Sequence, residues 1–225
     1  GLYSADPKLV ENAIHYSHFP LKALRESCYW GAKVLHYRSV ELAINKKVPL
    51  YIGSSQSPSQ GTLILDSNIE ENMYEEVKAL TVNSLDNIQI LTMKCSHTQE
   101  GFMELEKALS AFQLGWPQIL FSSYRQDEWQ ILITYPEEQS TDLKQALFAS
   151  LIKIEPQILT AVTLTCNGHY MTHLNQKVLL HLKTENIYPL YTLHLSPNLI
   201  FIINPEQKIK AIRALHQFIN SALRP

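Results

Sequence analysis

Hydrophobic and polar positions in the opening third of the chain follow first a helical and then a strand spacing. Apolar residues recur on one helical face over residues 20–30, and Gly31 marks the end of this predicted helix. A second short amphipathic helix follows, and the apolar run 49–52 then predicts a buried strand. A helix that leads directly into a strand is typical of an α/β layer. The residues that define the two helical faces are Leu21, Leu24 and Cys28 in the first helix and Val40, Ala43 and Ile44 in the second.

In the rest of the chain, apolar runs and amphipathic stretches follow one another in a repeating order. From Val77 the signals run strand, strand, helix, strand, strand, helix, and a second pass follows. The spacing is that of a βαββαβ unit, in which two helices cover one face of an antiparallel sheet. Predicted strands cover residues 77–82, 88–93, 118–122, 129–135, 161–166, 190–195 and 199–203, and predicted helices cover residues 101–114, 142–152, 172–183 and 205–223.

Composition and charge narrow the classes of function. The 225 residues are 45% hydrophobic, which suffices for packed cores in more than one small domain. The 19 Lys+Arg are scattered among 21 Asp+Glu and the formal net charge is −2, so we expect no nucleic-acid partner. The cysteines Cys28, Cys95 and Cys166 stand singly, as in a reducing compartment. Because we find neither a signal peptide nor the apolar run of roughly 20 residues that a membrane span needs, we expect a cytoplasmic protein without a membrane partner.

Lys33 is a candidate for phosphate chemistry. It follows Gly31 at the end of the first predicted helix and precedes His36. Its compact charge could face a phosphate, and it could equally be a solvated lysine that complements the helix dipole. Neither a GxxxxGK[ST] nor a GxGxxG phosphate loop occurs in the chain. The residues alone therefore leave both interpretations of Lys33 open.

Several short segments of the first 64 residues resemble, in order, the C-terminal end of the kinase domain of aspartokinases. They are LYSADP at 2–7, GAKVLH at 31–36, SVELA at 39–43, VPLYIGSS at 48–55 and GTLI at 61–64. The chain departs from that family at Lys8, where an arginine is more usual, and at Tyr37, where a proline usually follows the histidine. The repeated βαββαβ pattern behind these segments resembles the tandem ACT regulatory domains of the same family.

The resemblance implies a fold class and a domain order. We expect an α/β piece of the amino-acid-kinase domain over residues 1–66, followed by two ferredoxin-like ACT domains in an α+β arrangement over 67–157 and 158–225. In the family one ACT unit is threaded into the other, so the strand 77–82 is a candidate to complete the second unit.

The same resemblance assigns nucleotide-binding residues. Tyr3 would contact the nucleotide, Asp6 would hold the loop, Lys8 would stand in for a phosphate-facing arginine, and Lys33 would reach the ATP phosphates. A lysine at position 8 keeps the charge but lacks the planar fork of arginine. Simple turn chemistry is the alternative interpretation of Tyr3 and Asp6.

The resemblance also assigns an amino-acid effector site to the first ACT unit. The effector would bind at the loop 95–102, where backbone amides at a helix start can hold a carboxylate. The candidate effector-binding residues are Gly101 and Phe102 in this loop and Ser122 and Ser123 on the facing strand. Lysine is the favoured effector by descent, but Gln118 and Tyr124 replace acidic residues that would balance its ammonium group.

Two functions from different classes follow. The parent protein would be an aspartate kinase that uses ATP with Mg²⁺ and L-aspartate at the start of lysine, diaminopimelate, threonine and methionine biosynthesis, with feedback through the ACT domains. The catalytic residues would lie outside this chain, which alone would be inactive. The alternative is a free-standing ACT-type regulatory subunit without catalysis. In either case we expect a homodimer through the ACT units. His169 and His173 share a helical spacing, but without a nearby third ligand in sequence we expect no metal site.

Overall fold

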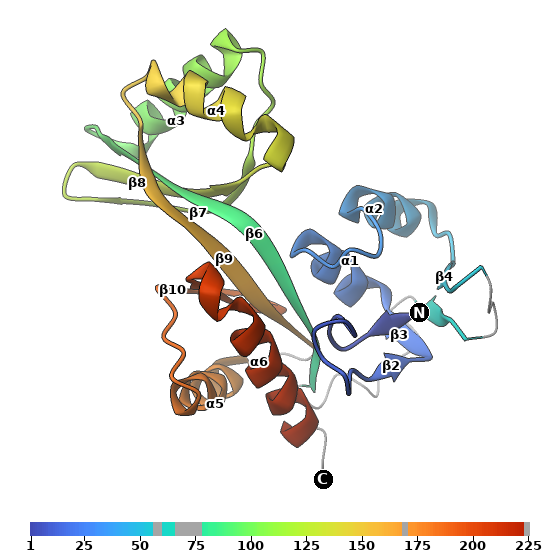
Figure 1. Ribbon diagram of the computed structural model, residues 1–225. Helices are drawn as coiled ribbons and strands as arrows, with labels where there is room; N and C mark the ends of the chain where they lie inside the picture. The colour runs from blue at the N-terminus through green and yellow to red at the C-terminus, as the bar shows by residue number, and fades with distance from the viewer. Residues whose placement is uncertain (56–59, 66–77, 168–170, 223–225) are drawn as a thin grey trace. The chain divides into compact units, whose positions relative to one another are not determined.

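The computed structural model describes residues 1–55, 60–65, 78–167 and 171–222 (Figure 1). It divides into two compact units, one of residues 1–85 with 161–225 and one of residues 86–160. The predicted domain boundary after residue 66 falls outside the described residues, and the boundary at residue 157 stays a prediction.

The opening segment is a small α/β arrangement. Its strands are β1 (Leu2–Tyr3), β2 (His15–Tyr16), β3 (His18–Pro20), β4 (Leu50–Ile52) and β5 (Thr62–Leu65), and its helices are α1 (Leu21–Tyr29) and α2 (Tyr37–Lys46). β1 and β2 form an antiparallel pair, while β5 lies between β3, which is parallel to it, and β4, which is antiparallel. Both predicted helices and the predicted strand are therefore confirmed.

Local sequence sets where these helices begin and end. Gly31 follows α1 with a φ of +98°, a conformation that L side chains rarely adopt. The His36 side chain caps α2 by accepting a hydrogen bond from the Arg38 N–H (3.3 Å), and Lys47 ends that helix in the left-handed region. The apolar core beneath both helices is built from buried residues that include Phe19, Leu24, Val40 and Ile64.

The unit of residues 86–160 is a complete βαββαβ arrangement. Its elements in chain order are the end of β6 (Lys78–Lys94), α3 (Thr98–Ala111), β7 (Gln118–Arg125), β8 (Glu128–Thr134), the 3-10 turn Glu137–Gln139, α4 (Ser140–Phe148) and the start of β9 (Lys153–Asn167). The strand order β9-β6-β8-β7 places the fourth strand beside the first, as in ferredoxin-like folds. Both helices cover one face of the sheet (Figure 1), because Leu105 of α3 and Leu147 of α4 share an apolar cluster with Leu91 and Ile131.

The second βαββαβ arrangement belongs to the other unit. It consists of the end of β9, α5 (Met171–Thr184), β10 (Tyr191–Leu195), β11 (Asn198–Ile203), the 3-10 turn Pro205–Gln207, α6 (Lys208–Ala222) and the start of β6, in the strand order β10-β11-β9-β6. Every residue of β11 is buried, and α5 packs against α6 (Figure 1), where the His181 ring meets Ala214 O at 2.9 Å. The predicted fold class, an α/β segment followed by two βαββαβ units, is confirmed.

Three predicted elements, two strands and one helix, need correction. The predicted strands 77–82 and 88–93 form one continuous strand, β6, because the polar stretch between them keeps an extended backbone and only Asn87 takes a positive φ (58°). The predicted helix 142–152 ends earlier, at Phe148. There the Ser150 hydroxyl donates to Leu147 O (2.7 Å) and accepts from Ile152 N (3.1 Å), which turns the chain out of the helix.

We predict that Gly31→Ala lowers the free energy of unfolding by about 2–4 kcal/mol, because its backbone conformation disfavours a side chain and the added carbon would collide with the Ser84 carbonyl. Gly115→Ala is the matched control, since a carbon added at Gly115 meets nothing within 4 Å. Chemical denaturation of both variants measures the difference. Equal effects would contradict the packing of Gly31 on β6.

Candidate functional site

The turn after β1 displays the residues predicted to face the nucleotide. Tyr3 is 38% exposed and its ring meets the His15 ring edge-on, with 5.1 Å between centroids. Asp6 and Lys8 are exposed, and the Lys8 N–H donates to Asp6 Oδ1 (2.9 Å). The carbonyl of Asp6 also accepts from the N–H groups of Leu9 (2.9 Å) and of Val10 (3.0 Å). Asp6 thus holds the turn, which agrees with the alternative interpretation of turn chemistry, and the Lys8 side chain stays at the surface.

Buried residues alternate with these exposed ones and fix the turn from below. Leu2, Ser4 and Ala5 are buried, and the Leu2 N–H donates to Thr62 Oγ1 (2.7 Å). The Ser4 carbonyl accepts from Val82 N of β6 (2.7 Å). Ser4 was not among the residues predicted from the sequence. A small hydroxyl residue between the exposed Tyr3 and the turn residue Asp6 was the available signal.

Lys33 lies in the turn that joins α1 to α2 and is exposed. Within the described part of the chain, no hydrogen bond or ion pair engages its ammonium group. That group is therefore available to an anionic ligand, as the phosphate interpretation requires. No described interaction joins Lys33 to Tyr3, Asp6 or Lys8, so their convergence on one nucleotide stays a prediction.

Three of the four predicted effector residues gather around the buried Trp129 of β8. Gly101 is buried against its ring, because an added carbon would lie 2.3 Å from Trp129 Cδ2. The Phe102 ring meets the indole edge-on at 5.1 Å, and the indole N–H donates to Ser122 Oγ (3.0 Å). Ser123, the fourth, lies beside Ser122 on β7 opposite Gln130. Ser122 therefore has a packing role whether or not it also touches an effector.

The loop before α3 is closed by its own hydrogen bonds. The Ser96 N–H donates to Glu100 Oε2 (2.8 Å), and the N-cap residue His97 accepts from the Glu100 N–H (3.4 Å). The Tyr124 hydroxyl reaches Ser96 O (2.7 Å) and Asp127 Oδ1 (3.0 Å). Desolvation and the hydrogen bond to Asp127 raise the pKa of Tyr124, so the phenol stays protonated. A ligand carboxylate at this helix start would therefore bind N–H groups other than those of Ser96 and Glu100.

Glu100 and Asp127 were missed as candidate site residues. The acidic positions expected from the resemblance are Gln118 and Tyr124 here, both on β7, and neither carries a carboxylate. The structure supplies two from the neighbouring segments: the Tyr124 hydroxyl contacts Asp127, and the negative charge of Glu100 is close enough to raise the Tyr124 pKa. Their negative charge could balance an ammonium group at this loop.

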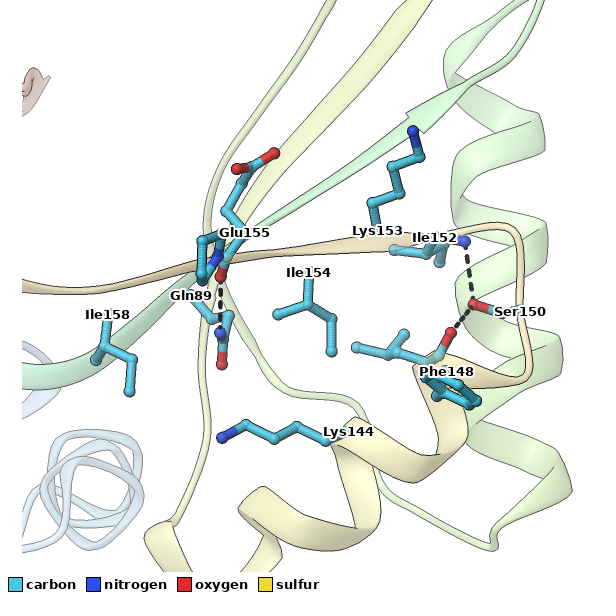
Figure 2. Close-up of a pocket in the computed structure, with 11 residues that line it drawn as sticks. Gln89, Lys144, Phe148, Ser150, Ile152, Lys153, Ile154, Glu155 and Ile158 are labelled. Atoms are coloured by element: carbon cyan, nitrogen blue, oxygen red, sulfur yellow. Dashed lines mark hydrogen bonds between the residues drawn. The ribbon is translucent and has the colours of Figure 1, made fainter.

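A groove lies between α4 and the start of β9, within the unit of residues 86–160 (Figure 2). This groove has a volume of about 670 Å³. Ile154 and Ile158 point into it, and Phe148 at its end is 92% exposed. Gln89 in its wall is engaged on both sides, donating to Glu155 O (3.2 Å) and accepting from the Tyr135 hydroxyl (2.7 Å). The groove thus combines apolar side chains with the charged side chains of Lys144, Lys153 and Glu155.

Other candidate sites give no further function. The side chains of His169 and His173 lie outside the described residues, and the described residues contain no group of three metal-binding side chains. Burial raises the pKa of the Cys28 thiol, and that of Cys166 to about 12, so neither is a reactive thiolate. No helix in the described ranges is long and apolar enough to cross a membrane.

Known proteins resemble this chain in sequence. A scan against protein-family models finds no match. The chain is 28% identical over 160 residues to the bifunctional aspartokinase/homoserine dehydrogenase of Buchnera aphidicola, a match that covers 65% of this chain and 19% of that protein.

Solved structures resemble the chain in fold. The aspartate kinase of Clostridium acetobutylicum matches 100% of this chain and 52% of its own, with a TM-score of 0.75 and 21% identity. E. coli aspartokinase III with aspartate and ADP matches 100% of this chain and 50% of its own (TM-score 0.72, 18% identity). The same enzyme with lysine and aspartate matches 97% of this chain and 49% of its own (TM-score 0.68, 21% identity). The chain thus has the fold of about half of these kinases.

We predict that Ser122→Ala lowers the free energy of unfolding by about 1–3 kcal/mol, because the buried Trp129 indole N–H loses its acceptor. Ser123→Ala, one residue further along the same strand, is the control, and we expect its effect to stay within about 0.5 kcal/mol. Urea unfolding of both variants measures the two changes in the free energy of unfolding. A neutral Ser122→Ala would show that the indole does not depend on this hydroxyl.

Proposed function

We propose that this chain, which is related in sequence and in fold to the C-terminal region of aspartokinases, is part of an enzyme that transfers the γ-phosphoryl group of ATP to L-aspartate. The observation that carries the proposal is the exposed turn of residues 3–8 on buried anchors, at the place where the aspartokinase resemblance puts a nucleotide. The ADP in the related E. coli enzyme is consistent with such a ligand.

The chain would contribute binding and charge. Tyr3 would lie against the nucleotide, Asp6 would keep the turn closed through the Lys8 N–H, and Lys8 and Lys33 would place ammonium groups toward the phosphates. Transfer of a phosphoryl group depends mainly on positioning the reactants and on neutralising the negative charge of the phosphates. The two lysines could contribute to both. Mg²⁺ would accompany ATP. The described residues of this chain do not fit a site for it, because Asp6 is engaged in the turn and no carboxylate group of three lies nearby.

The opening segment also argues for the kinase over a free-standing regulatory module. Residues 1–65 share a compact unit with the second βαββαβ arrangement. Gly31 packs on the backbone of β6, and the Glu26 carboxylate accepts from Asn198 of β11 (2.9 Å). An independent amino-acid-binding module would need neither this packed opening segment nor the exposed Lys33 that it carries.

The βαββαβ arrangements would serve feedback by an amino acid at residues 95–102, which the structure divides into a short loop (95–97) and the first residues of α3. Backbone amides at the start of α3 suit a carboxylate, and Glu100 and Asp127 would face the ammonium group. The related E. coli enzyme is also known in complex with lysine, which keeps lysine the favoured effector. β7 is the edge strand of the unit of residues 86–160, and pairing there would give the proposed homodimer.

The nucleotide proposal is tested by Lys33→Ala in the complete enzyme. Loss of one charged hydrogen bond to a phosphate should weaken ADP binding about tenfold, measured by isothermal titration calorimetry. Lys22→Ala on α1 is the control, because Lys22 is equally exposed and is not expected to face the nucleotide. The proposal fails if the complete enzyme binds no ADP or forms none in the presence of ATP and aspartate. Equal affinities of the two variants would remove Lys33 from the site.

The effector proposal is tested by titration with lysine, threonine and methionine. We expect Glu100→Gln, which keeps an acceptor for Ser96 N but removes the charge, to weaken lysine binding more than methionine binding. Calorimetry gives both affinities. Lysine binding that is unchanged in this variant would place its ammonium group elsewhere.

A further inference from the structure

Ser4 anchors the candidate nucleotide-facing turn of residues 3–8 through its hydrogen bonds. It is 0% exposed, although Tyr3 before it and Asp6 two residues after it are exposed. Its N–H donates to Ile14 O (2.9 Å), and its hydroxyl oxygen accepts from Ile14 N (2.8 Å). The same oxygen lies 2.9 Å from Nε2 of His216, a residue of α6 at the far end of the chain. The position of the turn therefore depends on a C-terminal helix.

His216 of α6 is in a position to form a hydrogen bond with Ser4 as a neutral ring. His216 is 1% exposed, and its Nδ1 lies 3.4 Å from the side-chain nitrogen of Asn220. A neutral imidazole has one donor and one acceptor nitrogen, and a hydroxyl can serve as either partner. Burial lowers the pKa of His216, which favours that neutral ring.

A second hydrogen bond ties α6 to the other end of the turn. Arg213 lies one helical turn before His216, and its Nε donates to Leu9 O (3.1 Å). Ser4 and Leu9 bracket residues 5–8, which include Asp6 and Lys8. Below them, Ala5 and Val10 are buried in the same apolar cluster as Ile212, Leu215 and Ile219 of α6. The helix thus holds the turn at both ends and from beneath.

We propose that His216 is a positioning residue for nucleotide binding: through Ser4 it holds the turn of residues 3–8 in the shape that receives a nucleoside di- or triphosphate. This inference rests on the proposed function. It assigns to α6, in the second βαββαβ arrangement, control over the affinity of the kinase segment for nucleotide. A shift of α6 would break the bond to Ser4, free the turn and weaken nucleotide binding.

Substitutions at position 216 test the proposal in the complete enzyme. His216→Leu keeps apolar bulk but removes both hydrogen-bonding nitrogens, while His216→Gln restores a group that can donate to Ser4 Oγ. Ile219→Val is the control, because it removes a buried methyl group from the same face of α6 and leaves the hydrogen bonds of His216 and Arg213 intact. Two quantities are measured: amide hydrogen exchange of residues 2–10 by mass spectrometry, and the Kd for ADP.

We expect His216→Leu to speed exchange in residues 2–10 and to raise the Kd about fivefold to tenfold, with most of both effects reversed in His216→Gln. Ile219→Val should lower the melting temperature and leave both quantities near the wild-type values. Ser4→Ala should affect both quantities at least as much as His216→Leu, because it also removes the acceptor of the Ile14 N–H, and the double variant should be no worse than Ser4→Ala alone.

Exchange of residues 2–10 that is the same in His216→Leu and Ile219→Val would overturn the tie to Ser4. Faster exchange with an unchanged Kd for ADP would overturn the positioning role. Failure of the proposed function has a different signature, because the wild-type enzyme would then bind no ADP at all, whatever the exchange shows.

Discussion

The first half of β6 is the constraint on which the remaining structure depends. It is a strand of the second βαββαβ arrangement, and its backbone also carries the opening segment. Leu80 O accepts the Tyr16 hydroxyl (2.6 Å), Val82 N donates to Ser4 O (2.7 Å), and Gly31 packs directly on this strand. Buried backbone groups must be paired, so a strand satisfied by two partners joins them into one body. The candidate nucleotide turn and the C-terminal sheet are therefore parts of one packed unit.

The sequence predicted most helices and strands because their apolar periodicity is local. It did not predict that β6 is continuous, since the polar residues between its halves look like a turn and only tertiary pairing keeps them extended. Strands as short as β3 and β5 were missed for the same reason. These strands are too short to show an alternation of apolar and polar residues. They form because they pair with neighbouring strands.

The candidate sites divide in the same way. Tyr3, Asp6, Lys8 and Lys33 were predicted from short segments that resemble a known family, and the structure places all four at the surface. The bond from Ser4 to His216 joins residues 212 positions apart, and no sequence pattern signals such a pair. The role of Ser122 as the acceptor for Trp129, and the carboxylates around Tyr124, likewise depend on how strands align. Sequence motifs thus predicted which exposed residues to consider, and only the packed structure revealed the contacts that hold them.

Hydrogen-exchange protection by ADP in the complete enzyme tests the central claim most directly, because it locates the nucleotide on the chain without any substitution. Binding of ADP should slow amide exchange both in residues 2–10 and in residues 31–36, the two segments that carry Tyr3, Asp6, Lys8 and Lys33. Protection confined to other parts of the enzyme, with both segments exchanging as fast as in the free protein, would contradict the claim that this turn and Lys33 face the nucleotide.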